Sequence, residues 1–494
     1  MMDLSLVSLE LGACLLGIVV LLVDLWTPAE RKAQLGWWVA GGLVAVFCYS
    51  FIIFGQGTGT GATGYVKDSL AVYFQGYFVL AAVLVVLLTQ SYAERIRSGI
   101  SELYALTCFA LAGMSFAAGA NSLVLLFVAV ELITITFYVL TSFERHRLRS
   151  LEAGIKYLIL GAASSAIMVF GIALIYGSTG ALDFHEVARA ASGLNDDSMM
   201  LLYQLGVLMT LGGLFFKLAA VPFQLWVPDV YQGAPTPVTT FLSTGSKAAG
   251  IVLILRLLDD ACPPLLGEAW LRQLLALMAA ATILYGSLCA LRQRNLKRLL
   301  GYSSIASAGF VLLGLMTLSD QGAQAVLFYL TAYIFGVVGA FTVISVVSEE
   351  SGDEDISTLA NLHQRSPLMA TVLTLSIISL AGVPPLAGFM GKFALLRAAI
   401  GSVAVHPVMP WVVGAALVGV VISFYYYFTV IREIFWGKGR FWAEEAPSTE
   451  PLPCPRAAEV VLLACLFGLI GLGLFPERIL YIAGEATEYL FTAN

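Results

Sequence analysis

Long apolar stretches alternate with short polar turns along almost the whole chain. A helix of about 20 apolar residues is long enough to cross a bilayer, and a window of that length finds about fourteen such stretches. The predicted spans lie near residues 4–26, 36–55, 69–91, 102–118, 121–142, 152–177, 199–222, 237–258, 268–291, 299–318, 322–348, 366–398, 407–436 and 456–476. We therefore expect an all-α polytopic membrane protein that forms a single integral membrane domain over residues 1–494.

Two of these spans contain the same proline-broken phrase. It reads LAAVP at residues 218–222 and LAGVP at residues 380–384, where a further proline follows. Proline inside a membrane helix removes a backbone hydrogen bond and opens the helix locally, so we predict helix breaks at Pro222 and at Pro384 and Pro385. Broken helices that recur in two halves of a membrane chain indicate an ion or substrate path between inverted repeats.

The composition excludes most other classes of protein. Apolar residues make up 59% of the chain and charged residues 12%, whereas a soluble domain has about 25% charged residues. No basic patch with interleaved aromatic residues is present, so we expect no nucleic acid partner. The seven cysteines form no C-x-x-C pair and the four histidines fall at or near loops. We accordingly expect no metal and no cofactor in this chain.

Basic residues gather in alternate loops, which gives an expected orientation. One set of loops holds Arg31, Lys32, Arg95, Arg97, Arg145, Arg147, Arg149, Arg292, Arg294, Lys297, Arg298, Arg365, Arg432, Lys438, Arg440 and Arg456. The other set, with the C-terminal tail, holds Lys67, Arg189, Arg256, Arg272, Arg397 and Arg478. By the positive-inside rule the first set is cytoplasmic. We expect both termini to be periplasmic, and the first span, which lacks a signal-peptide pattern, to be retained.

Four further lysines lie within apolar spans, namely Lys156, Lys217, Lys247 and Lys392. A lysine in hydrocarbon costs roughly 2.5–3.5 kcal/mol on insertion scales, so it is rarely there without a role. Glu131 is the matching acid, and we expect it to be the only firmly buried one. Glu152 precedes Lys156 by four residues, so the two can pair along one helix face as an accessory of the same site.

These groups suggest a proton relay, because a buried lysine can give up its proton whereas arginine cannot. We expect Glu131 to pair with Lys217 as a switch, Lys247 to take the proton next across a hairpin at residues 227–233, and Lys392 to pass it on. Moving one charge against 100 mV requires about 2.3 kcal/mol, so a partner must supply the power. The alternative for each lysine is structural, by snorkelling or helix packing. The acidic loop at residues 348–357 is expected to be solvated rather than a partner contact.

Three phrases carry a resemblance to a known family. They are VPFQLWVPDVYQGAPTPV at residues 221–238, NLKRLLGYSSI at 295–305 and LAGVPPLAGFMGKF at 380–393. They resemble the antiporter-like membrane subunits of respiratory complex I, and among these the subunit N family of bacterial NADH–quinone oxidoreductases. The similarity covers nearly the whole chain. Lysine at position 392 favours subunit N, because one sister subunit is acidic there.

The resemblance implies fourteen helices with two inverted five-helix repeats and discontinuous helices 7 and 12. Residues 1–101 then hold helices 1–3, 102–258 the first repeat, 268–436 the second repeat, and 456–494 the last helix and tail. It also implies that the proton-relay residues of helices 5, 7, 8 and 12 are Glu131, Lys217, Lys247 and Lys392.

The family works inside a large complex of the bacterial inner (plasma) membrane, where NADH oxidation and quinone reduction drive proton pumping. NADH, FMN, iron–sulfur clusters and quinone are then expected in partner subunits. The expected neighbours are another antiporter-like subunit, small membrane subunits and lipid. Two other functions stay open: a subunit of a multi-subunit cation/proton antiporter or membrane-bound hydrogenase, and a membrane scaffold whose buried charges only specify packing. A solute transporter is disfavoured, because no mix of polar and aromatic residues surrounds the breaks.

Overall fold

The computed structural model describes residues 6–54, 59–61, 64–96, 99–403, 407–437 and 450–491. Three members of the expected cytoplasmic basic set, Arg97, Lys438 and Arg440, lie outside the described residues. All of the candidate relay residues lie within them.

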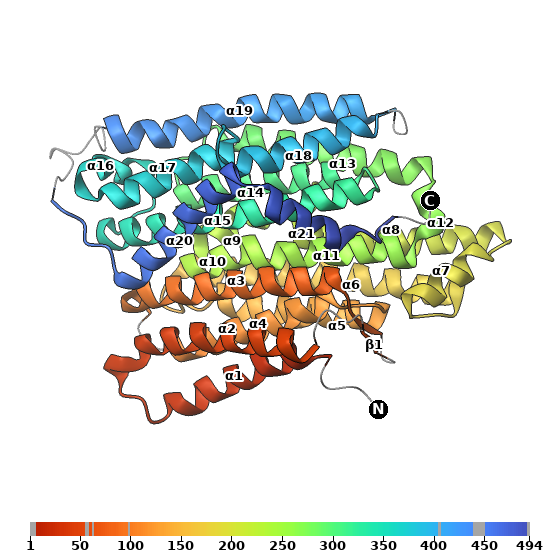
Figure 1. The fold of residues 1–494 in the computed structure, drawn as a ribbon, viewed down its shortest axis with the longest axis horizontal. Helices are drawn as coiled ribbons and strands as arrows, with labels where there is room; N and C mark the ends of the chain where they lie inside the picture. Colours follow the sequence, from red (N-terminus) through yellow and green to blue (C-terminus); the bar gives the residue numbers. More distant parts are fainter. Residues whose placement is uncertain are drawn as a thin grey trace.

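The described chain is helical apart from one small antiparallel sheet, in which β1 (Gly59–Gly61) pairs with β2 (Tyr65–Lys67). Most helices run along one common direction in a single bundle, with α1 and α2 at one edge and α19 at the opposite edge (Figure 1). The helices of the first half are α1 (Ser8–Asp24), α2 (Leu35–Phe54), α3 (Ser69–Ser91), α4 (Ile100–Ala118), α5 (Leu123–Thr141), α6 (Leu148–Thr179), α7 (Phe184–Ser192), α8 (Asp197–Leu218), α9 (Val227–Gly233), α10 (Thr236–Phe241) and α11 (Lys247–Arg256). Those of the second half are α12 (Pro263–Leu266), α13 (Ala269–Ala290), α14 (Leu296–Leu315), α15 (Asp320–Ser351), α16 (Leu362–Arg365), α17 (Pro367–Ala381), α18 (Ala387–Gly401), α19 (Met409–Trp436), α20 (Arg456–Leu474) and α21 (Glu477–Thr487).

Twelve helices in the described part of the chain are long and apolar enough to cross a membrane. Helix is also found in each of the fourteen predicted spans. Two of these spans are not among the twelve long helices. One holds α1, which has 17 described residues, and the other is split into α17 and α18, which have 15 residues each. The prediction of an all-α polytopic membrane protein is confirmed, whereas the count of fourteen and the division into repeats stay predictions.

Both predicted helix breaks are present. After α8 the chain turns through Ala219, which has a φ of 62°, and α9 begins only after Pro222. After α17 the chain turns through Gly382, which has a φ of 90°, and α18 begins after Pro384 and Pro385. Each proline lies where a continuing helix would need its missing N–H group, which is why these two spans are split.

The segment at residues 227–233 was expected to be a hairpin, and this prediction was wrong. It forms the short helix α9, with Pro228 in its first turn, where a missing N–H costs nothing. The Val230 N–H donates to the Trp226 carbonyl at 3.0 Å and so starts the helix. The consequence is a second helical half after the first break.

The centre of the bundle is formed by the span from α10 to α11, together with α14 and α15. The span from Thr236 to Ala261 is buried along its whole length. Its helix contains a π-helical turn over Leu242–Ser246, directly before Lys247. Such turns are rare and occur frequently at functional sites, and this one includes the small polar residues that precede the lysine.

Close packing of α6 on α8 brings the first break against the bundle. A Cβ atom on Gly171 of α6 would stand 2.6 Å from the carbonyl oxygen of Gly206 on α8. Only glycine permits this approach, and small residues at helix contacts are the usual means of close packing within a membrane. The contact places the last turn of α8 beside the aromatic side chains of α6.

Candidate functional site

Lys217 lies in the last turn of α8, directly before the first break. Its side chain is 3% exposed, and its Nζ lies 3.5 Å from the hydroxyl oxygen of Tyr157 on α6. Tyr157 stacks on Phe216, and the indole N–H of Trp226 donates to the Phe216 carbonyl at 3.1 Å. Among the described carboxylates none forms an ion pair with Lys217. The ammonium group is therefore enclosed by aromatic surface with a hydroxyl as its neighbour.

Glu131 lies on α5 and is half-buried rather than firmly buried, so that part of the prediction was wrong. It accepts a hydrogen bond from the hydroxyl of Ser165 on α6. No ion pair joins Glu131 to Lys217 among the described residues, so the expected direct pair is not formed. Val128 and Ile135, one turn before and after Glu131, are 50% and 56% exposed. Glu131 thus lies on an outward face of the bundle.

Lys247 begins α11 and is 4% exposed. Its Nζ donates to the carbonyl oxygen of Ser304 on α14 at 3.0 Å and contacts the Ser304 hydroxyl at 2.5 Å. The hydroxyl of Tyr231 on α9 lies 3.2 Å from the same serine hydroxyl. One serine therefore joins Lys247 to the half-helix that follows the first break.

Lys392 lies on α18, just after the second break, and is 7% exposed. Its Nζ donates to the carbonyl oxygens of Leu380 at 2.7 Å and Ala381 at 3.1 Å, which end α17. Those carbonyls have no partner within their own helix, and a cation is favourable at a helix C-terminus. The Phe310 ring centroid lies 5.0 Å from the same nitrogen. Lys392 is therefore held across the break by two carbonyl oxygens.

Glu152 and Lys156 form the expected ion pair at 2.6 Å on α6. The structure extends it to α9, because Lys156 Nζ also lies 2.7 Å from Asp229 Oδ2. Asp229 Oδ1 in turn lies 2.6 Å from Arg298 Nη1 on α14. Sequence reasoning missed Asp229 and Arg298, although both fall within the phrases that carry the family resemblance. The four charges link three helices at one edge of α9.

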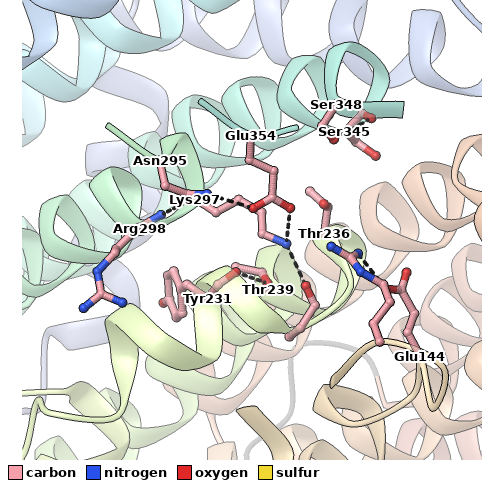
Figure 2. Close-up of polar contacts among 12 residues, drawn as sticks. Glu144, Tyr231, Thr236, Thr239, Asn295, Lys297, Arg298, Ser345, Ser348 and Glu354 are labelled. Atoms are coloured by element: carbon pink, nitrogen blue, oxygen red, sulfur yellow. Dashed lines mark hydrogen bonds and ion pairs between the residues drawn. The ribbon is translucent and has the colours of Figure 1, made fainter. Parts of the chain in front are cut away.

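Lys297 is a second residue that sequence reasoning misplaced, since it was assigned to a loop. It is 0% exposed, and its Nζ lies 3.0 Å from Glu354 Oε1 and donates to the Ala234 carbonyl at 2.8 Å. The side chains of Lys297 and Glu354 point toward one another between α14 and the segment after α15 (Figure 2). The acidic loop is thus not simply solvated: Glu354 is 7% exposed and pairs with the lysine that donates to the Ala234 carbonyl at the end of α9.

A further buried acid, Glu10 on α1, contradicts the expectation that Glu131 is the only one. Glu10 is 0% exposed and accepts from the Tyr65 hydroxyl at 2.8 Å and from Gln75 Nε2 at 3.0 Å. Lys67 Nζ donates to the Ser50 hydroxyl at 2.9 Å in the same region. The signal was present in the sequence as a lone carboxylate near the start of an apolar span.

Known proteins resemble this chain over most of its length. The family described as NADH:quinone oxidoreductase/Mrp antiporter, TM, matches residues 120–423. The NADH-quinone oxidoreductase subunit N of Desulforamulus reducens is 36% identical over 485 residues, which are 98% of each chain. A chain of respiratory complex I from Thermus thermophilus is 32% identical, with a TM-score of 0.78 over 96% of this chain and 99% of that chain.

A chain of the Mrp complex from Dietzia sp. DQ12-45-1b has a TM-score of 0.82 over 100% of this chain and 98% of that chain, at 21% identity. That similarity shows a shared fold and nothing more. Since one family spans residues 120–423 and a relative at 36% identity is covered from end to end, the chain belongs to the NADH:quinone oxidoreductase/Mrp antiporter family, in its NADH-quinone oxidoreductase subunit N branch.

Proposed function

We propose that the chain carries protons across the membrane as a membrane-arm subunit of a bacterial NADH–quinone oxidoreductase (complex I). The observation that carries the proposal is the burial of three lysines, on α8, α11 and α18, without an ion-pair partner among the described residues. Lys217, Lys247 and Lys392 are at most 7% exposed, and their hydrogen-bond partners in the described structure are hydroxyl and carbonyl oxygens. A buried ammonium group without a counter-ion is costly, so lysines placed in this way are suited to exchange protons rather than to anchor salt bridges.

The half-helix α9 offers a route to the central lysine. Asp229, in the first turn of α9, forms ion pairs with Lys156 and Arg298. Two residues further on, Tyr231 reaches Ser304, which holds Lys247. We infer that protons reach Lys247 along α9 and that Lys217 and Lys392, each at a helix break, receive or pass them on.

Glu131 takes the role of a coupling residue at a subunit boundary. Its outward face on α5 supports a neighbour there, which we take to be another membrane subunit of the same complex. The power for pumping comes from redox chemistry in partner subunits, where NADH, FMN, iron–sulfur clusters and quinone bind. We assign no redox centre to this chain.

The location that we propose is the bacterial inner membrane, with both termini periplasmic. The start of α1 and the end of α21 lie at the same end of the bundle (Figure 1), which supports an even number of crossings. The orientation itself rests on the distribution of arginine and lysine among the loops.

Two other functions remain as competitors. A cation/proton antiporter subunit is supported by the shared fold of the Mrp chain alone. A scaffold is supported by pairs such as Lys297 and Glu354, whose charges do serve packing. The three relay lysines differ from that pair because no carboxylate among the described residues forms an ion pair with them.

The test is a Lys217→Ala variant in membranes of a bacterium that assembles the chain with its native partners. Assembly is checked on native gels, and NADH–quinone electron transfer and proton pumping are measured in the same vesicles. We expect an assembled complex in which both activities fall. Lys32→Ala is the control, because Lys32 is a part-exposed lysine with its own carboxylate partner, Asp24.

An assembled Lys217→Ala complex with both activities unchanged would show that the lysine is structural. A scaffold role predicts poor assembly, with normal pumping in whatever complex remains. Sodium-dependent pumping in place of proton pumping would favour the antiporter.

A further inference from the structure

A cavity of about 1160 Å³ lies where α19 packs beside the connection between α13 and α14. Its lining comes from three segments: residues 291–294 of that connection, residues 355–357 after α15, and one face of α19 between Phe424 and Glu433. The floor is held in place, because the Ile356 N–H donates to the Arg294 carbonyl at 2.8 Å. The proton-relay residues do not line it.

Three arginines surround this cavity, namely Arg292, Arg294 and Arg432. All three side chains are exposed, and within the described part of the chain their guanidinium groups form no ion pair and no hydrogen bond. Two carboxylates, Asp355 and Glu433, also line the cavity. Asp355 accepts from the Ser357 N–H at 2.9 Å and from its hydroxyl at 2.7 Å. The cavity therefore keeps an excess of unpaired positive charge.

An aromatic stripe leads along α19 to one of these arginines. Phe424, Tyr425 and Phe428 precede Arg432 on the face that lines the cavity. Tyr425 is 69% and Phe428 is 55% exposed, on a helix that is long and apolar enough to cross the membrane. Phe428 and Arg432 are one helical turn apart, about 6 Å along the axis. Apolar surface and a guanidinium group thus follow one another along the axis of α19.

We propose that this cavity binds an anionic phospholipid, with the phosphate at the arginines and an acyl chain along the aromatic stripe. Guanidinium groups bind phosphate oxygens through paired, charge-assisted hydrogen bonds. Basic pockets between transmembrane helices on the cytoplasmic side are suited to anionic head groups. A free phosphate ion would leave the aromatic stripe without a binding partner, and an apolar lipid tail alone would leave three arginines unpaired.

The experiment uses the intact complex purified in mild detergent. Native mass spectrometry counts the phosphatidylglycerol and cardiolipin molecules that stay bound to the wild type and to an Arg292→Gln/Arg294→Gln/Arg432→Gln variant. We expect the variant to lose one anionic phospholipid per complex. The control Arg31→Gln removes an exposed arginine of the same loop set away from the cavity and leaves the count unchanged.

A second measurement does not depend on assembly of the triple variant. A photo-crosslinking benzophenone amino acid in place of Tyr425 is irradiated in native membranes. We expect an adduct with the mass of a phospholipid that survives an excess of inorganic phosphate.

An adduct with another polypeptide would mean that a neighbouring subunit fills the cavity, and the proposal would be overturned. Loss of the adduct in phosphate, or an unchanged lipid count in the triple variant, would overturn it as well. Because Lys217 and its partners lie elsewhere, these outcomes are independent of the pumping assay.

Discussion

Replacing Lys297 by methionine removes one partner of a fully buried ion pair. Lys297 Nζ lies 3.0 Å from Glu354 Oε1, and Asn295 Nδ2 donates to the other carboxylate oxygen at 3.1 Å. At an effective dielectric constant of about 20, charges at this separation attract one another by roughly 5–6 kcal/mol before desolvation is counted. Breaking a buried pair by removing one partner costs about 3–5 kcal/mol, because the other charge is left uncompensated.

The assay is thermal unfolding of the purified complex in detergent, with residual NADH–quinone activity as the second readout. Lys297→Met is expected to destabilise this subunit by about 3–5 kcal/mol. The double variant Lys297→Met/Glu354→Gln is expected to recover part of that loss, since glutamine keeps the contact with Asn295 and carries no charge. Contacting residues usually show coupling energies of about 0.5–3 kcal/mol.

The pH dependence gives an independent check. Burial by itself would raise the pKa of Glu354, but the Lys297 ammonium group and the Asn295 amide outweigh it and hold the pKa below its usual value of 4.5. A lowered pKa in the folded state means that the stabilisation is complete above pH 4.5 and is lost as the pH falls further. The difference between wild type and Glu354→Gln should therefore shrink only in acid. If the two single variants add up in the double variant within about 0.5 kcal/mol, the reasoning is refuted.

Two further predictions concern the relay itself. Ser304→Ala removes the hydroxyl contact of Lys247, a hydrogen bond to a charged group worth about 1.5–3 kcal/mol, and leaves the carbonyl contact. Proton pumping should therefore fall in an assembled complex. Ser303→Ala, on the same helix, is the control, and equal pumping in both variants would contradict the role of Ser304. Gly382→Ala places a Cβ atom 3.0 Å from Lys392 Cδ at a φ of 90°, which costs about 1–2 kcal/mol from the backbone alone. Its thermal midpoint should drop, whereas Gly414→Ala, which has open space around it, should leave the midpoint unchanged; equal midpoints would argue against strain at the break.

The residues that sequence reasoning found and missed differ in one physical respect. Lys217, Lys247 and Lys392 are charged residues inside apolar stretches, and such residues can be recognised from the sequence without knowledge of the fold. Lys297 and Glu354 lie next to loops in the sequence, where charges are ordinarily solvated, and are buried only because α9 and α14 meet there. The error for Glu131 was of the same kind: the apolar run placed it near the middle of an apolar helix, as it lies in α5, but did not indicate that its side chain is only half-buried.

The class of the protein, the approximate spans, the two helix breaks and the lysines inside apolar helices could all be inferred from the amino-acid sequence. These follow from local properties: apolar length against bilayer thickness, the missing N–H of proline, and the cost of charge in hydrocarbon. Which groups are in contact depends on how the helices pack: Ser165 contacts Glu131, Ser304 contacts Lys247, and the carbonyls that end α17 contact Lys392. Contacts between helices depend on how their faces rotate and cross, and hydrophobic patterning in nearly uniformly apolar helices leaves that rotation undetermined.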